Sequence, residues 1–316
     1  MAPMSTRILY SSGALRATMT GQSSERVMFT FDHWRRDRRG MAPPPSGAPF
    51  TTRGFAHIHV STARNDWFLA PDLAALLTTL AGVAAHFPVR AGLGFSMGGF
   101  GLFAVSRAVP LTQALFVSPQ TTCRPDLPLD HAIEDGRFPQ DLADPVFACE
   151  ADHVIRHTPP SDAACVVLFD PTLPFDARHA AEVARGFVAP RLVPMPGAGH
   201  PVTDALPPTR AFGTVARAAC APGVAEHFVT QAFARFRRNP AKALLEQIRP
   251  KGEEADEDRR DRSHEDRPRR QIFRNADPFG LRGVQGVGKG FERGVQDLGD
   301  PDQRDHGDDP APVVAV

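Results

Sequence analysis

The chain has 316 residues, of which 36 are basic and 36 acidic, together with 31 Pro, 26 Gly and 4 Cys. This length allows one large α/β domain or two ordinary domains, and a hydrophobic fraction of 42% excludes collagen-like, disulfide-rich and wholly disordered classes. The zero net charge hides an asymmetry, because residues 251–316 hold 12 basic and 16 acidic side chains whereas residues 1–250 hold 24 and 20. We therefore expect one globular domain over residues 1–250 and a charged, disordered tail over residues 251–316.

The same composition limits the partners and the compartment. A body charge of +4 is too small to favour nucleic acid as a partner. No apolar run reaches the roughly 18–20 residues of a membrane span, and the first 22 residues lack the apolar core of a secretory signal, so a cytoplasmic location is expected. The four cysteines are widely spaced with no CxxC pair, which disfavours disulfides and a cysteine-based zinc site. Nothing in the sequence indicates an oligomeric state.

The body alternates short apolar runs with segments of helical periodicity. Strands are predicted at residues 27–31, 55–60, 89–95, 113–117, 165–169 and 191–195. Helices are predicted at residues 71–87, 96–107, 145–157, 176–187 and 224–249, the last with a break near residues 239–240. This alternation is typical of βαβ units, so the fold class is α/β, with a mostly parallel sheet and helices on both faces. Residues 118–162 are expected to form a small cap or lid at the carboxyl edge of the sheet.

One motif carries nucleophile chemistry. The sequence Gly94-Phe95-Ser96-Met97-Gly98 is a G-x-S-x-G that follows a predicted strand and precedes a predicted helix. A sharp turn at this point would expose the Ser96 hydroxyl at the edge of the sheet, and the tight packing of such a turn requires glycine on both sides. The N–H of Met97 would then face the site and could stabilise an oxyanion. An incidental serine in a glycine-rich turn is the alternative.

A serine nucleophile needs a base that is oriented by an acid. His200 lies in the glycine-flanked loop that follows the last predicted strand, which makes it the candidate base. Asp170 directly follows the strand at residues 165–169 and is preferred as the acid. Asp176 is the second candidate for the acid, although it could equally cap the following helix.

These motifs, in the order Ser, Asp, His, resemble the α/β-hydrolase superfamily over about residues 25–210. A narrower resemblance to uncharacterised bacterial α/β-hydrolase-like proteins, some linked to surface-glycan loci, lies in residues 65–67, 118–120 and 169–179. The superfamily resemblance implies a second oxyanion donor in the loop after an early strand, which places the backbone N–H of Asp32 or His33 there.

The expected function is a serine hydrolase that cleaves an ester or related acyl bond through an acyl-enzyme, without a metal or an organic cofactor. The expected substrate is a small-molecule or glycan-linked acyl group. Acyl transfer by the same triad, for instance to a glycan, stays open. So does a non-catalytic interaction protein on a hydrolase fold, because the usual His-Gly dipeptide of the oxyanion loop is absent here.

Two further histidines are candidate metal ligands. His57 and His59 share one face of a predicted strand, since side chains alternate with period two. No third ligand accompanies them in the sequence, so we interpret them as hydrogen-bonded structural residues rather than a zinc site.

Overall fold

The computed structural model describes residues 6–21, 23, 25–36, 38–121 and 159–237. The chain divides into two units, Met1–Phe279 and Gly280–Val316, and every described residue belongs to the first. The expected helix at residues 145–157, most of the expected cap and the charged tail lie outside the described residues.

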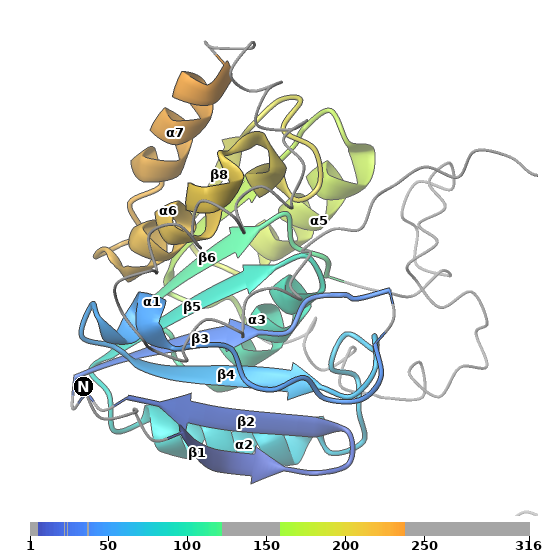
Figure 1. Cartoon of the computed structure of the whole chain (residues 1–316), viewed down its shortest axis with the longest axis vertical. Coiled ribbons are helices and arrows are strands. Elements are labelled where there is room, and N and C mark those ends of the chain that lie inside the picture. Colours follow the sequence, from blue (N-terminus) through green and yellow to red (C-terminus); the bar gives the residue numbers. More distant parts are fainter. Residues whose placement is uncertain (1–5, 22, 24, 37, 122–158, 238–316) are drawn as a thin grey trace, which may run out of the picture. The chain divides into compact units, whose positions relative to one another are not determined.

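The centre of the structure is a sheet of eight strands in the order β1-β2-β4-β3-β5-β6-β7-β8 (Figure 1). The strands are β1 (Thr6–Ser11), β2 (Leu15–Thr20), β3 (Arg26–Phe31), β4 (Ala56–Thr62), β5 (Val89–Phe95), β6 (Gln113–Val117), β7 (Ala164–Phe169) and β8 (Pro190–Pro194). From β4 to β8 all neighbours run parallel, whereas β2 runs antiparallel to both β1 and β4. The predicted mostly parallel sheet is therefore confirmed.

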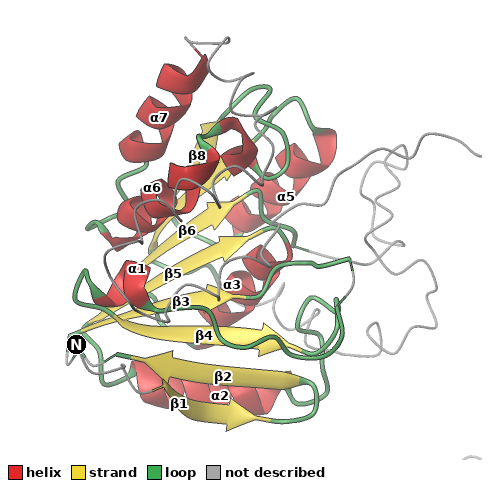
Figure 2. Cartoon of the chain, in the orientation of Figure 1, coloured by secondary structure: helices red, strands yellow, loops and turns green. Residues whose placement is uncertain are grey.

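Helices cover both faces of this sheet, as the sequence predicts (Figure 2). The helices are α1 (Ala48–Thr51), α2 (Leu73–Ala84), α3 (Met97–Ala108), α5 (Pro174–Arg185), α6 (Pro208–Cys220) and α7 (His227–Arg237), with a 3-10 turn η2 (Val202–Ala205). Apolar side chains of α2, α3 and α5 pack in one buried cluster on one face, and those of α1, α6, α7 and η2 pack in a second cluster on the other.

The parallel strands are apolar on both sides because each side meets a helix layer. Alternate residues of β6 and β7 belong to opposite clusters, so that Ala114 and Phe116 pack with α3 while Leu115 packs with α6. This double burial is why these segments read as continuous apolar runs in the sequence. It also fixes their register, since a slip by one residue would exchange the two faces.

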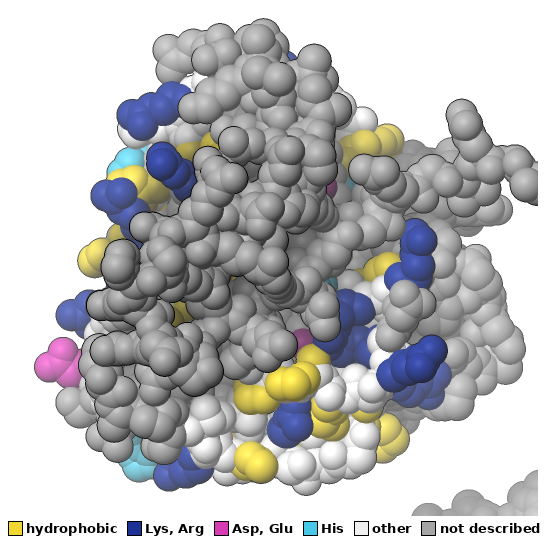
Figure 3. Space-filling model, viewed as in Figure 1, with side chains coloured by type: hydrophobic (Ala, Val, Ile, Leu, Met, Phe, Trp, Pro, Cys, Tyr) yellow, Lys and Arg dark blue, Asp and Glu magenta, His cyan; other side chains and the backbone are white. Residues whose placement is uncertain are grey.

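Several elements were missed from the sequence. β1 and β2 were not predicted because each carries Arg, Ser or Thr along with its apolar residues, and β1 is an exposed edge strand. The helix α6 was also missed, although its apolar stripe includes the buried Val215 and Ala219. On the face shown in Figure 3, Lys and Arg side chains gather on the described surface more than Asp and Glu do. None of the helices in the described ranges is long and apolar enough to cross a membrane.

Candidate active site

Ser96 occupies the junction between β5 and α3, where the chain turns sharply from strand to helix. Its backbone has φ 48° and ψ −121°, a conformation that costs a non-glycine residue on the order of 1–3 kcal/mol and persists only where the surroundings enforce it. The surrounding hydrogen bonds do so, because the Ser96 N–H donates to Val117 O and the Ser96 carbonyl accepts from the N–H groups of Gly99 and Gln120. The predicted location of the serine at a strand-to-helix turn is confirmed.

The glycines of the motif are required by close approach. A Cβ on Gly94 would lie 2.6 Å from the carbonyl oxygen of Gly98, and a Cβ on Gly98 would lie 2.9 Å from the carbonyl oxygen of Asp32. Real Cβ atoms do not approach backbone oxygens that closely. The turn can therefore close only with glycine at both positions, which is the packing requirement expected from the sequence.

His200 lies in the loop after β8, and its side chain reaches Ser96. The Nε2 atom of His200 lies 2.9 Å from Ser96 Oγ. On the other side of the ring, Nδ1 lies 2.6 Å from Oδ1 of Asp176. Because an ionised carboxylate only accepts hydrogen bonds, Nδ1 carries the proton and Nε2 accepts from the serine hydroxyl. The three groups thus form one line of hydrogen bonds, which is the arrangement that a nucleophile, a base and an orienting acid require.

The carboxylate beside His200 belongs to Asp176 and not to Asp170, so the preferred order of the two acids was wrong. Asp176 is fully buried in the first turn of α5, near the partial positive charge of the helix N-terminus. The sequence position that suggested a helix cap is the same position that brings the side chain to the imidazole. Asp176 Oδ2 is buried and has no hydrogen-bond partner among the described residues.

Asp170 instead holds the backbone of the histidine loop. Its carboxylate accepts hydrogen bonds from the N–H groups of Gly197 at 3.0 Å and Gly199 at 2.8 Å. It also accepts from the N–H and the hydroxyl of Thr172 at 2.9 and 2.7 Å. Burial by itself raises the pKa of Asp170, but these hydrogen bonds, from Gly199 most strongly, outweigh burial and lower the pKa below its ordinary value.

The expected oxyanion donors differ in their availability. Met97 is the first residue of α3, so its N–H is among those that have no acceptor within the helix. The N–H of Asp32 donates to Val60 O at 2.9 Å as part of the sheet, so the expectation that Asp32 donates to an oxyanion was wrong. His33 lies in the loop after β3. Burial is the main cause that lowers the pKa of its side chain to about 4, and the charges of Arg35, Arg38 and His59 lower it further.

A buried arginine fixes the loop that carries His33. The side chain of Arg38 is only 2% exposed and binds the Asp32 carboxylate at 2.8 Å. It also donates to Thr62 O, to Asn65 Oδ1 and to the carbonyl of His33, and so ties the loops after β3 and β4 together. Burial favours a raised pKa for Asp32, but the hydrogen bond from His59 and the charges of His59 and Arg38 hold that pKa well below its usual range.

Gln120 is a site residue that the sequence reasoning did not single out as functional. It follows β6 and is fully buried, and its Oε1 lies 3.4 Å from Ser96 Oγ and accepts from Trp67 Nε1 at 3.2 Å. Trp67 and Gln120, one from each of two segments of the narrower resemblance, thus meet beside Ser96. Only that resemblance, and the position of both segments directly after strands, could have indicated it.

The architecture follows from two observations. The strands have the order given above, with β2 antiparallel to its neighbours, and Ser96, Asp176 and His200 follow β5, β7 and β8 in turn. The chain has the α/β-hydrolase fold. No family model matches the chain, and no curated protein matches it.

Solved structures with this likeness include an acetyl xylan esterase from a Thermoanaerobacterium species, which is 13% identical over 69% of this chain and 88% of that chain, with a TM-score of 0.43. The capsule O-acetyltransferase of Neisseria meningitidis serogroup A is 11% identical over 60% and 85%, with a TM-score of 0.39. A dienelactone hydrolase from Anabaena variabilis is 14% identical over 69% and 95%, with a TM-score of 0.38.

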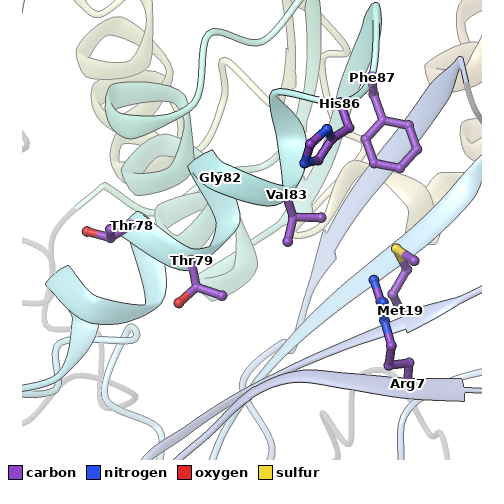
Figure 4. A pocket seen from close by; sticks show the side chains of 8 residues that line it. All are labelled: Arg7, Met19, Thr78, Thr79, Gly82, Val83, His86 and Phe87. Atoms are coloured by element: carbon purple, nitrogen blue, oxygen red, sulfur yellow. The ribbon is translucent and has the colours of Figure 1, made fainter.

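Two other features lie apart from Ser96, Asp176 and His200. His57 Nε2 and His59 Nδ1 lie 2.7 and 2.8 Å from the hydroxyl of Thr30, so both histidines are hydrogen-bonded within the sheet. A pocket of about 450 Å³ lies between α2 and the strands β1 and β2 (Figure 4). Its lining includes Arg7, Met19 and His86, which stand toward the amino ends of the parallel strands, away from the edge that carries Ser96.

Proposed function

We propose that this protein is a serine hydrolase that cleaves an ester or related acyl bond through Ser96, His200 and Asp176. The observation that supports the proposal is the line of hydrogen bonds from Ser96 Oγ through the imidazole to the Asp176 carboxylate, with separations of 2.9 and 2.6 Å. Both distances fall within the reach that proton transfer between a nucleophile and its base requires. The acyl donor proposed is a small-molecule or glycan-linked ester.

In the proposed mechanism, Ser96 Oγ attacks the acyl carbon while His200 Nε2 takes the hydroxyl proton. Asp176 holds the Nδ1–H tautomer and stabilises the imidazolium that forms. The imidazolium then gives its proton to the leaving oxygen, which departs as an alcohol and leaves the acyl group on Ser96. A water molecule attacks this acyl-enzyme, with His200 again acting as the base, and the carboxylic acid and the free serine are released.

The first test is covalent labelling with a fluorophosphonate probe, which phosphonylates activated serines. The wild type is expected to be labelled, and Ser96→Ala is expected to be unlabelled. Ser106→Ala is the matched control, since Ser106 is a buried serine of the same helix whose hydroxyl donates to Phe103 O, and this variant should label like the wild type. Labelling that persists in Ser96→Ala, or a wild type that is never labelled, would show that Ser96 is not an activated nucleophile.

Hydrolysis and acyl transfer share the acyl-enzyme and differ only in what attacks it. Turnover of p-nitrophenyl acetate in the presence of increasing concentrations of an acceptor alcohol separates them. We expect free acetate as the main product at all alcohol concentrations. An acetylated alcohol as the main product would reassign the protein to acyl transfer with the same nucleophile.

A further inference from the structure

Gln120 is bound to the nucleophile turn at two points. Its backbone N–H donates to the Ser96 carbonyl at 3.0 Å. Its side-chain Oε1 lies 3.4 Å from the Ser96 hydroxyl. The preceding Ser118 has a positive φ of 42°, and its hydroxyl accepts from the N–H of Val202, just after the histidine loop. The position of Gln120 is therefore set by both the serine and the histidine segments.

The orientation of the Gln120 amide follows from its partner. Trp67 Nε1–H can only donate, so the Gln120 atom that faces it at 3.2 Å must be the carbonyl oxygen. The amide nitrogen Nε2 is then the end of the carboxamide that does not bind Trp67. This Nε2 is buried and has no hydrogen-bond partner among the residues that the structure describes. Burying a donor without a partner is costly, and such groups in folded proteins call for an explanation, catalysis being one.

We propose that Gln120 is a catalytic residue whose Nε2 donates a hydrogen bond to the oxyanion of the tetrahedral intermediate, together with the N–H of Met97. This inference rests on the proposed function. In the intermediate, the oxyanion is bonded to the carbon that Ser96 Oγ has attacked. Gln120 Nε2 belongs to the same carboxamide as Oε1, and Oε1 lies 3.4 Å from Ser96 Oγ. The N–H of Asp32 cannot serve because Val60 O accepts it.

Trp67 has a defined part in this arrangement. Its indole N–H donates to Oε1, which fixes the orientation of the carboxamide and leaves Nε2 as the end that can donate to the oxyanion. The donor is thus fixed before the reaction starts, which is the condition under which a hydrogen bond lowers the barrier most. Trp67 is a positioning residue in this scheme, and Gln120 is the residue that contacts the substrate.

The test is the kinetics of Gln120→Met and Gln120→Glu with p-nitrophenyl acetate. Both variants remove the amide N–H, while Met preserves the approximate length and Glu preserves an acceptor for Trp67. We expect kcat to fall about 10²- to 10³-fold with KM changed much less, since the lost bond forms mainly in the transition state. Inhibition by a trifluoromethyl ketone, which forms a stable tetrahedral oxyanion on the serine, should weaken by a similar factor.

The thermal midpoint of each variant shows whether it is folded, and Ser106→Ala serves as the control with unchanged kinetics. If both Gln120 variants fail to fold, Trp67→Phe decides the matter, because releasing the carboxamide should lower kcat without a matching change in KM. Unchanged kcat and unchanged ketone affinity in a folded variant would overturn the inference and assign the second donor to another group, such as the N–H of His33, while the proposed function stands. A wild type that neither turns over nor reacts with the fluorophosphonate would overturn both.

Discussion

Two aspartates that stand six residues apart hold His200 in different ways. Asp176 binds the imidazole, whereas Asp170 binds the backbone N–H groups of the loop from which that imidazole projects. Asp170 lies in the turn that links β7 to α5, and Asp176 lies in the first turn of α5 itself. The side chain and the main chain of the base are therefore fixed from one place in the fold, and the two carboxylates cannot replace each other.

Changing each aspartate to asparagine should affect different properties of the protein. Asp176→Asn should lower kcat by about 10²- to 10⁴-fold with little effect on stability, because the neutral amide no longer fixes the productive tautomer. Asp170→Asn should mainly lower stability, because its carboxylate accepts from several donors at once. Steady-state kinetics and thermal unfolding of both variants check this, and a larger kcat loss in Asp170→Asn would contradict the assignment.

The pH dependence of stability gives the second half of that comparison. The pKa of Asp170 is lowered in the folded protein, so its contribution is present above the unfolded pKa of about 3.9 and is lost as the pH falls through the folded pKa. The difference in unfolding free energy between the wild type and Asp170→Asn should therefore be largest near neutral pH and shrink below pH about 4. A difference that grows in acid would show that the carboxylate is not stabilised in its ionised form.

At the scale of elements, the turn between β5 and α3 depends on backbone contacts that leave no room for a Cβ. Gly98→Ala would bring a methyl group against the Asp32 carbonyl and Phe31, so β3 and α3 would have to separate. We expect a loss of about 1–3 kcal/mol in the free energy of unfolding and a larger loss of activity, because Ser96 and Met97 would shift with the turn.

The matched control for this change is Gly82→Ala in α2, where an added Cβ meets nothing within 4 Å. A glycine in the middle of a helix is less favourable than alanine, so this variant should be more stable than the wild type by about 0.5–1 kcal/mol. Denaturant unfolding of both variants measures the two effects. Equal stability of Gly98→Ala and the wild type would mean that the turn can close around a larger residue.

The sequence predicts the buried parallel strands and the turn between β5 and α3 well, and it predicts β1 and β2 poorly, for a physical reason. A strand buried on both faces, such as β7, is apolar throughout, and a turn that needs glycine on both sides leaves a recognisable pattern. In β2, Arg16 and Thr18 stand between apolar residues, so this strand does not form the continuous apolar run by which the buried parallel strands were predicted. The choice between Asp170 and Asp176 failed because both follow the same strand, and only the direction of the following helix decides which reaches the imidazole.

At the scale of the whole molecule, residues 1–250 hold 24 basic and 20 acidic side chains, whereas residues 251–316 hold 12 and 16. The composition of the latter segment lacks the apolar periodicity that a packed core needs. Truncation after residue 250 is therefore expected to change the free energy of unfolding by less than about 1 kcal/mol and to leave fluorophosphonate labelling unchanged. Calorimetry and labelling of the truncated chain check this, and a marked drop in either would assign the segment a structural part in the domain.

Among the described residues, five non-glycine residues have positive φ, and four of them, Trp67, Phe68, Ser96 and Ser118, follow the carboxyl ends of β4, β5 and β6. Glycine at the small residues Ser96 and Ser118 would relieve this strain, whereas glycine at Trp67 or Phe68 would leave a cavity in place of a fully buried side chain. Selection for heat resistance alone is therefore expected to favour glycine at Ser96 and Ser118. At Ser96 this change would stabilise the fold and remove the proposed nucleophile. Stabilising substitutions should therefore be sought away from this edge of the sheet, and a screen for thermal stability needs an activity assay beside it.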